Sequence, residues 1–193
     1  MAAFQSTKGH ILIISGPSGV GKGTIIAEIK RRQPSIGLAI SATTRSPRAG
    51  EANGLAYHFL SEAEFDTHIE QGDFLEWCQV HTHKYGTLKS EVLRYTEAGN
   101  NVILEIDVQG ARKVKAQCPE AVRVFIMPPD MDALRDRLRL RDTDDPQVIQ
   151  KRLIVAQTEV EAAPEYDFVF MNHHGHVDDV VQKILALLPE HSK

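Results

Sequence analysis

The fold is decided by the stretch Gly16-Pro17-Ser18-Gly19-Val20-Gly21-Lys22-Gly23-Thr24, which we call the glycine loop. It follows an apolar run at residues 10–14 and precedes a helix-like segment at residues 25–32. Glycines let successive backbone N–H groups turn inward around phosphate oxygens, and the following helix directs its positive dipole end at the same anion. Lys22 adds a compact positive charge on a long stem. The order strand, glycine loop, lysine and helix therefore predicts a phosphate-binding site.

One position of the glycine loop departs from the usual pattern. The residue after the lysine usually carries a hydroxyl that binds Mg²⁺, whereas here Gly23 occupies that place and Thr24 comes one residue later. Either Thr24 reaches a phosphate or the metal, or the metal is held by water and carboxylates. The alternative to a phosphate site is a glycine-rich turn with a surface lysine.

The composition bounds the class of protein. The chain has 193 residues, 42% hydrophobic and 25% charged, which predicts one globular unit with a sizeable core. A net charge of −4 argues against a general nucleic-acid surface. Cys78 and Cys118 are too few for a metal site or a disulfide framework, so we expect both to be reduced and packed. No apolar run approaches the roughly 20 residues that span a bilayer, and the first residues lack an apolar signal region, so we expect a cytoplasmic protein with no membrane contact.

Strand-like apolar runs alternate with helix-like segments along the chain. The runs lie at residues 11–14, 38–41, 102–106, 122–127 and 168–171, and the last segment, 177–188, has apolar residues at helical spacing. This alternation predicts an α/β fold with a mainly parallel sheet flanked by helices. Residues 40–90, with a helix-like piece at 62–71, and the charged residues 130–155 interrupt it. We expect both to be insertions at the strand ends, where such folds bind ligands.

Residues 41–51 form a second group with a chemical signature. A proline within this stretch disfavours a helix, so Arg45 and Arg48 are expected on a loop. Two arginines held so close repel each other unless an anion lies between them, and guanidinium groups bind phosphate in bidentate fashion. One interpretation is a second phosphate site. The other is two exposed arginines that pair with Glu51 and Glu62, and the residues themselves leave both open.

Residues 74–77 and 85–87 indicate how a base could be recognised. Guanine presents two N–H donors beside the O6 acceptor. Glu76 could accept both donors, and Ser41 and Thr87 could donate to O6. Adenine presents the opposite pattern and would leave buried polar groups unpaired, so such a pocket rejects it. The alternative is that Glu76 is an ordinary solvated strand residue.

Carboxylates follow the apolar run at residues 102–106. Glu105 and Asp107 have alternate spacing, which would place them on the same side of a strand. Beside a phosphate loop, this is where a water-bridged Mg²⁺ belongs. The alternative is a capped strand end.

The charged stretch at residues 132–142 carries arginines one helical turn apart. Arg137 and Arg141 would share one helix face and, with Arg152, could close as a mobile lid over a transferring phosphoryl group. Closure would also exclude water and prevent wasteful hydrolysis. The alternative is a solvated face on which aspartates offset the arginines.

Together these pieces resemble guanylate kinases. The matching pieces follow the family's order over essentially the whole chain: the glycine loop and residues 41–51, 57, 74–77, 85–87, 104–110 and 128–129. The resemblance implies a P-loop nucleoside-monophosphate kinase fold in a single domain, with a core (1–39, 91–129 and 156–193), a GMP-binding region (40–90) and a lid (130–155). It also implies the Mg²⁺-dependent reaction ATP + GMP ⇌ ADP + GDP, with dGMP left open as an acceptor.

The resemblance assigns roles residue by residue. It implies a clamp for the GMP phosphate formed by Arg45, Arg48, Tyr57 and Tyr85. It implies contacts to the guanine edge from Ser41, Glu76, Thr87 and Asp107. It implies an ATP site formed by Gly16, Pro17, Ser18, Gly19, Val20, Gly21, Lys22, Gly23 and Thr24, with Asn172 near the adenine. The catalytic cations would be Lys22, Arg45, Arg137, Arg141 and Arg152. No direct Mg²⁺ ligand is assigned, and Glu105, Asp107 and Thr24 are candidates for water-mediated contact.

In that reaction the GMP phosphate oxygen attacks the γ-phosphorus in line, and the cations hold and neutralise both reactants, so we expect no essential general base. ATP and GMP are the expected partners, and the sequence does not decide between a monomer and a homo-oligomer. Three alternatives are a guanylate-kinase-like module that binds phosphorylated peptides, a kinase for another small phosphate acceptor, and a nucleotide-binding switch. The intact glycine loop argues against the first, and Glu76 with its two hydroxyl neighbours argues against the second. Nucleotide binding without turnover would favour the third.

Overall fold

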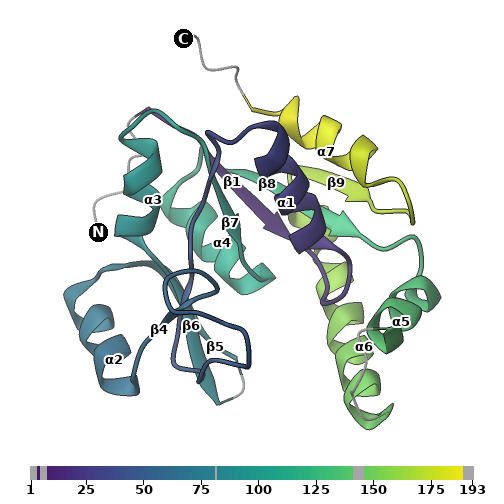
Figure 1. The fold of residues 1–193 in the computed structure, drawn as a ribbon, viewed down its shortest axis with the longest axis horizontal. Helices are drawn as coiled ribbons and strands as arrows, with labels where there is room; N and C mark the ends of the chain where they lie inside the picture. Colours follow the sequence, from purple (N-terminus) through teal and green to yellow (C-terminus); the bar gives the residue numbers. More distant parts are fainter. Residues whose placement is uncertain (1–3, 5–7, 81, 141–145, 189–193) are drawn as a thin grey trace. The chain divides into compact units, whose positions relative to one another are not determined.

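The computed structural model describes residues 4, 8–80, 82–140 and 146–188 (Figure 1). The chain divides into two compact units. Unit 1 consists of Met1–Leu12, Ile36–Leu104 and Gln109–Ala121, and unit 2 of Ile13–Ser35, Glu105–Val108 and Val122–Lys193. The strands of the main sheet have the order β2-β7-β1-β8-β9, and β1 (Ile11–Ser15), which is buried throughout, belongs to both units.

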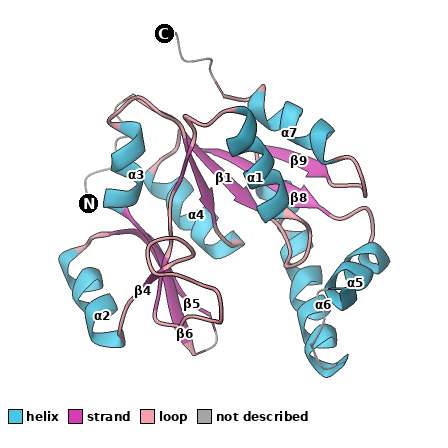
Figure 2. Ribbon diagram, in the orientation of Figure 1, coloured by secondary structure: helices cyan, strands magenta, loops and turns pink. Residues whose placement is uncertain are grey.

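Unit 1 is built around a second, four-stranded sheet with the order β4-β3-β6-β5. β3 pairs with β4 in parallel and with β6 in antiparallel fashion, and β5 and β6 form an antiparallel pair. This sheet lies beside α2 (Figure 2), and the two pack through Phe65 and Phe74, whose stacked rings have centroids 4.4 Å apart. The elements of unit 1, with their border residues, are β2 (Gly37–Leu38), β3 (Ala42–Thr43), β4 (His58–Phe59), α2 (Glu62–Gln71), β5 (Phe74–Val80), β6 (His83–Leu88), α3 (Lys89–Thr96), β7 (Val102–Glu105) and α4 (Val108–Gln117).

Unit 2 carries the glycine loop and the C-terminal half of the chain. β8 and β9 pair in parallel, with Val124 opposite Phe168. α1 and α7 contact each other, and Arg32 of α1 pairs with Asp178 of α7. Each helix has a buried apolar side, made by Ile25, Ile26 and Ile29 in α1 and by Val180, Val181 and Ile184 in α7. The elements are α1 (Lys22–Arg32), β8 (Val122–Met127), α5 (Met131–Leu140), α6 (Pro146–Glu161), a short 3₁₀ turn (Ala163–Glu165), β9 (Phe168–Met171) and α7 (Val177–Leu185).

The predicted α/β class is confirmed, since β2 with β7 and β8 with β9 pair in parallel and helices follow most strands. The strands at 122–127 and 168–171 and the helix at 62–71 have the predicted bounds. Cys78 and Cys118 are buried and reduced, as expected. The division into core, GMP-binding and lid regions stays a prediction.

The expected strand at residues 38–41 is confirmed only at Leu38. β2 ends at Leu38, and the chain forms β3 in the other sheet from Ala42 onwards. The backbone N–H groups of Gly37 and Ala39 donate to β7 and the residue just before it, whereas the N–H of Ile40 points to the opposite, unpaired edge and donates to a carboxylate oxygen of Glu91 at 3.2 Å. A side chain from α3 therefore satisfies the backbone where the chain leaves the main sheet, a contact that no local pattern reveals.

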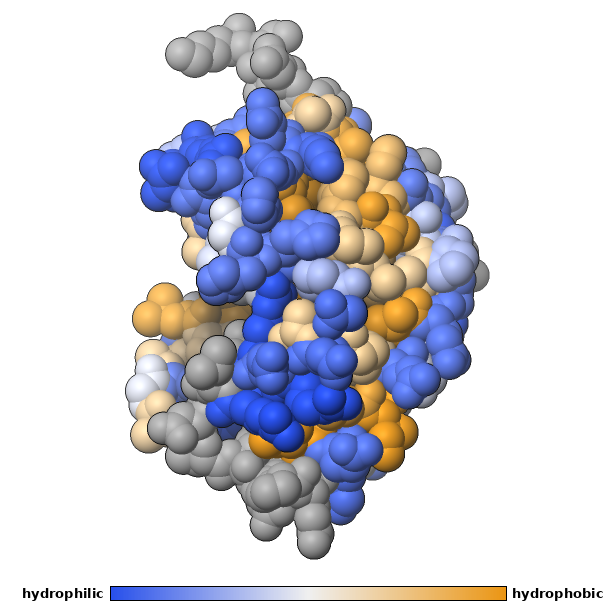
Figure 3. Space-filling model, turned by 90° about the vertical axis from the view of Figure 1, so that its right-hand side faces the viewer, coloured by the Kyte–Doolittle hydropathy of each residue, from blue (hydrophilic) through white to orange (hydrophobic). Residues whose placement is uncertain are grey.

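No helix among the described residues is both long and apolar enough to cross a bilayer. On the face shown in Figure 3, apolar surface is interspersed with hydrophilic surface. The exposed large apolar residues of unit 2 are Ile154, Val155, Phe168, Val169 and Met171.

Candidate functional site

The glycine loop has the geometry of an anion site. Gly16 has φ of 145°, and a Cβ there would lie 2.4 Å from the carbonyl oxygen of Ile126, so close backbone packing requires glycine. Gly21, with φ of 103°, precedes the first residue of α1, which places the positive end of that helix at the loop. The strand, loop and helix of the sequence prediction are therefore all present.

Lys22 is the first residue of α1, and its side chain folds back over the glycine loop. Its ammonium group donates to the carbonyl oxygens of Gly16 at 2.5 Å and Pro17 at 3.3 Å. The residue is half-buried. The positive charge thus lies over the loop, where a phosphate group bound to the backbone N–H groups would meet it.

A carboxylate that the sequence analysis did not single out lies against the same loop. Glu159 of α6 accepts a hydrogen bond from the backbone N–H of Ser18 and interacts electrostatically with Lys22 and Asp107. Burial, the largest effect, raises the pKa of Glu159, Asp107 raises it further, and Lys22 and Ser18 lower it. One signal was available in the sequence, because Glu159 continues the three-residue spacing of the buried Leu153 and Ala156.

Arg137 of α5 reaches the glycine loop. Its two terminal nitrogens donate to the carbonyl oxygens of Val20 at 2.9 Å and Asn172 at 2.8 Å. Leu138, next along the helix, packs so closely on the loop that a Cβ on Gly19 would lie 2.9 Å from its side chain. Arg137 is therefore held at the loop and is not a member of a solvated helix face.

Asn172 follows β9 and is buried. Its side-chain amide donates to the carbonyl oxygen of Val20 at 2.8 Å, and a Cβ on Gly21 would lie 2.7 Å from the same amide nitrogen. Its side-chain oxygen is buried and accepts no hydrogen bond from the described part of the chain. A buried acceptor of this kind suits a ligand N–H group.

The structure gives less information on the other two predicted lid arginines, Arg141 and Arg152. Arg152 lies on α6 and is half-buried, and Arg141 lies outside the described residues. The catalytic roles of both stay predictions.

The structure brings the three residues predicted to contact Mg²⁺ through water, Thr24, Glu105 and Asp107, only partly together. β7 ends at Glu105, so the strand alternation that was expected to group Glu105 with Asp107 does not extend to Asp107. Glu105 and Thr24 are exposed, and Asp107 is half-buried near Glu159. Within residues 4, 8–80, 82–140 and 146–188, no three His, Cys, Asp or Glu side chains are grouped so as to hold a metal ion.

In unit 1, Arg45 and Arg48 lie on a loop, as expected. The Arg45 guanidinium pairs with the carboxylate of Glu51, with both contacts at 3.0 Å, and donates to the carbonyl oxygen of Ser46 at 2.8 Å. The backbone N–H of Arg48 donates to the same carboxylate at 2.8 Å. Hydrogen bonds from Arg45 and, to a lesser extent, from the backbone of Arg48 lower the pKa of Glu51. Glu62, the other carboxylate that the sequence suggested as an arginine partner, pairs with Lys84 at 3.0 Å.

Aromatic side chains orient Arg45. Its guanidinium carbon lies 5.4 Å from the ring centroid of Tyr57 and 5.7 Å from that of Phe59. The rings of Tyr57 and Tyr85 lie edge to face, with their centroids 6.0 Å apart. Glu51 has the largest effect in raising the pKa of Arg45, and a hydrogen bond with the Tyr85 side chain raises it further. Three of the four residues implied for the phosphate clamp, Arg45, Tyr57 and Tyr85, are therefore in mutual contact, whereas the Arg48 side chain is exposed.

Glu76 and Thr87 form a buried pair in the same unit. A β-bulge between Phe74 and Glu76 shifts the register of β5 so that Glu76 lies opposite Thr87. The Thr87 hydroxyl donates to a carboxylate oxygen of Glu76 at 2.8 Å, and the two residues are only 1% and 5% exposed, respectively. Glu76 is thus not a solvated strand residue. Ser41 lies next to β3 and is half-buried, while Asp107 belongs to unit 2, and its role toward a base stays a prediction.

Comparison with known proteins gives a consistent result. The family model for guanylate kinase matches residues 8–191. The guanylate kinase of Caldanaerobacter subterraneus subsp. tengcongensis is 48% identical over 181 residues, which cover 94% of this chain and 87% of that protein. The guanylate kinase of Synechocystis sp. is 44% identical over 185 residues, which cover 96% of each chain.

A solved structure has the same fold. The crystal structure of guanylate kinase from Anaplasma phagocytophilum matches with a TM-score of 0.76 at 29% identity, covering 94% of this chain and 85% of that chain.

Proposed function

Because this chain belongs to the guanylate kinase family, it is a nucleoside-monophosphate kinase that transfers the γ-phosphate of ATP to GMP, and we propose how its residues divide that work. The glycine loop with Lys22 holds ATP, and the Arg45 loop with the Glu76 pocket holds GMP. The buried pair of Thr87 and Glu76 carries the assignment of guanine, since a desolvated carboxylate requires donors.

On the ATP side, Lys22 exchanges the carbonyl oxygens of Gly16 and Pro17 for phosphate oxygens. This exchange is favourable because a charged acceptor binds an ammonium group more strongly than a carbonyl does. The first turn of α1 adds its backbone N–H groups and dipole. The side-chain oxygen of Asn172 accepts from the adenine amino group, which satisfies a buried acceptor.

On the GMP side, Arg45 binds the phosphate while Glu51 and the Tyr57 ring hold the guanidinium in place. A guanidinium carries five N–H donors, so its bonds to Glu51 and Ser46 do not exhaust it. The hydroxyls of Tyr57 and Tyr85 add donors from the same cluster. Glu76 accepts the two N–H donors of guanine, Ser41 donates to O6, and Thr87 turns its one hydroxyl proton from Glu76 to O6 when guanine binds.

Mg²⁺ is the further group that the family implies. Thr24, Glu105 and Asp107 supply oxygen donors of the type that Mg²⁺ prefers, and a site with few protein ligands suits an ion that keeps water and binds phosphate. When bound, it would neutralise charge on the phosphates of ATP. These residues would hold it through water molecules.

The transfer itself depends on positioning. A GMP phosphate oxygen attacks the γ-phosphorus in line, and ADP leaves. Lys22, Arg45 and Arg137 reduce the repulsion between the two polyanions and stabilise the charge on the transferring group, so no side chain acts as an essential base. We also propose that the enzyme works in the cytoplasm on free nucleotides, without nucleic acid or membrane.

A coupled assay of ADP release tests this function. GMP, AMP, CMP and UMP are offered in parallel with ATP and Mg²⁺, and calorimetry measures ATP binding separately. Turnover with GMP alone supports both the reaction and the Glu76 pocket. ATP binding without turnover of any acceptor would favour a binding module or a nucleotide switch instead.

A further inference from the structure

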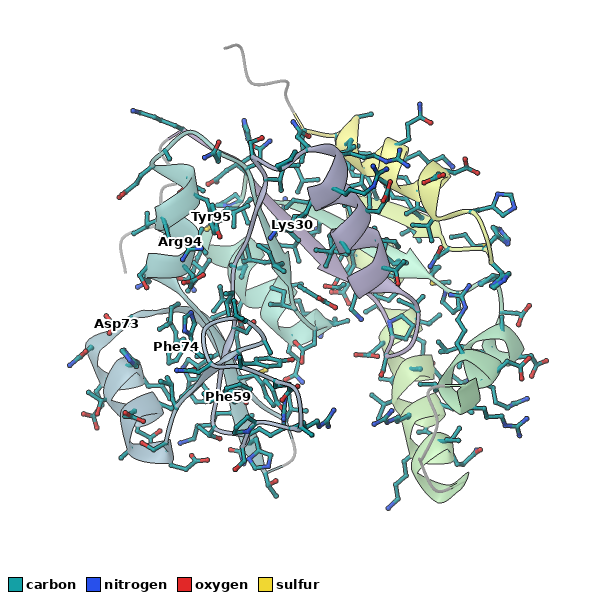
Figure 4. All side chains as sticks on the ribbon, in the orientation of Figure 1. Lys30, Phe59, Asp73, Phe74, Arg94 and Tyr95 are labelled. Carbon is teal, nitrogen blue, oxygen red and sulfur yellow. The ribbon has the colours of Figure 1, made fainter. Side chains whose placement is uncertain are left out.

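A buried carboxylate outside the proposed contacts joins two segments of the GMP site. Glu91 lies on α3 and is 7% exposed. One of its oxygens accepts from the backbone N–H of Ile40 at 3.2 Å, and the other lies 3.2 Å from Nε2 of the His58 ring. Arg94, one turn further along α3 and labelled in Figure 4, approaches the carboxylate at 3.6 Å. A buried carboxylate needs such partners, because desolvation without them is costly.

The contacts close into a ring of hydrogen bonds. Ile40 is followed by Ser41, whose carbonyl oxygen accepts from the backbone N–H of His58 at 2.9 Å. The imidazole of His58 contacts Glu91, which closes the set. This closed set of contacts includes Ser41 and the residue that follows Tyr57. It therefore fixes the backbone of a proposed guanine contact relative to that of a proposed phosphate contact.

We propose that Glu91 is a positioning residue of the GMP site, which holds Ser41 and Tyr57 at a fixed separation through the backbone of Ile40 and the ring of His58. The proposal rests on the function proposed above, since Ser41 and Tyr57 are taken as GMP contacts. Two segments that bind opposite ends of one ligand must be correctly spaced before it arrives, or binding must supply the cost of ordering them. Glu91 provides that spacing from a helix, which is a rigid support.

A purely structural role would have different consequences. A core defect lowers thermal stability and reduces the active fraction of enzyme, which lowers kcat and does not distinguish the two substrates. A positioning role raises KM for GMP and leaves KM for ATP nearly unchanged. The split between the two KM values therefore separates the roles.

The test compares Glu91→Gln with Glu70→Gln, a matched substitution at an exposed position of α2 in the same unit. Glutamine keeps one oxygen acceptor, so the fold is expected to survive while one of the two contacts is lost. We expect Glu91→Gln to raise KM for GMP, and Kd for GMP measured by calorimetry without ATP, by about tenfold, since small misplacements of binding groups have effects of this order or larger. KM for ATP should change less than about twofold, and Glu70→Gln should change neither constant.

A second variant tests whether Glu91 acts through its contact with His58. His58→Gln alone and combined with Glu91→Gln form a double-mutant cycle, and the double variant should lose little more than the worse single variant, because both residues act through one contact. An unchanged Kd for GMP in a folded Glu91→Gln variant, or an equal rise in both KM values, would overturn the proposal. If the wild-type enzyme itself does not phosphorylate GMP, the function proposed above fails rather than the role of Glu91.

Discussion

The guanidinium of Arg137 donates to the carbonyl oxygen of Val20 at 2.9 Å, so α5 is tied to the backbone of the glycine loop. A second bond from the same side chain, to the carbonyl oxygen of Asn172 at 2.8 Å, joins the end of β9 to the pair. Arg137 thus fixes the loop and the proposed adenine contact together. Its planar fork suits two carbonyl oxygens, whereas an ammonium group cannot span them in the same geometry.

Replacing Arg137 with lysine should therefore weaken the binding of ATP. We expect KM for ATP to rise by about tenfold, since one charge-assisted hydrogen bond to a carbonyl is lost, with KM for GMP changing much less. Steady-state kinetics with each substrate varied in turn measure the two constants. Arg135→Lys on the same helix is the matched control, because Arg135 pairs with Asp132 of its own helix. An equal effect of the two substitutions would contradict the role of Arg137.

Lys22→Met should abolish phosphoryl transfer and leave the fold intact. The ammonium group of Lys22 donates to the carbonyl oxygens of Gly16 and Pro17 on the surface of the glycine loop, and we expect its loss to reduce activity far more than thermal stability. The transferring phosphoryl group, in contrast, loses a fixed cation, and we expect kcat to fall by about a thousandfold or more. Lys30→Met, at an exposed position of the same helix (Figure 4), should keep full activity. Unfolding of Lys22→Met, seen by circular dichroism, would show that Lys22 is structural.

The sequence predicted best where a local pattern and a tertiary role coincide. The glycine loop is one example, because its preceding strand, its glycines and its lysine are contiguous, and the backbone geometry at Gly16 and Gly21 requires glycine. The start of α2 is another, since the spacing of Ser61 and Glu64 is that of the capping box which the two residues form.

The sequence could not predict features made by distant residues. The contact of Glu91 with the backbone of Ile40 joins residues 51 positions apart, and the place of Glu159 against Ser18 depends on how α6 packs. Glu91 has no local pattern that distinguishes it from a solvated glutamate, and the spacing of Glu159 with Leu153 and Ala156 indicates a buried face but not the contact with Ser18. The opposite placement of Glu76 and Thr87 likewise depends on a β-bulge, which shifts the register by one residue and cannot be read from alternation alone.

Glu76→Gln should raise KM for GMP by about a hundredfold or more and leave KM for ATP nearly unchanged. An amide has one acceptor oxygen and adds donors, so it cannot accept both guanine N–H groups, and buried unpaired donors cost binding energy. Thr87→Val tests the partner separately, because it removes the hydroxyl that donates to Glu76 and keeps the side-chain shape. Initial rates, with the concentrations of GMP and ATP varied independently, measure the two KM values. Parallel rises in both KM values would remove the guanine assignment of this pocket.

Glu159→Gln should stabilise the protein at neutral pH and have no effect in acid. Burial, the largest effect, raises the pKa of Glu159 in the folded state above its ordinary value. Below the unfolded pKa the carboxyl is protonated in both states. As pH rises, the unfolded chain releases its proton first, so the stability contributed by the protonated folded form is lost by the time pH passes the folded pKa. Glutamine stays neutral throughout, and its Tm should exceed that of the wild type at neutral pH and converge with it below about pH 4. Thermal melts across this range measure the difference, with Glu161→Gln at an exposed position of the same helix as control. A lower Tm for Glu159→Gln at neutral pH would mean that the charged form, bound to the Ser18 N–H and Lys22, stabilises the loop more than its burial costs.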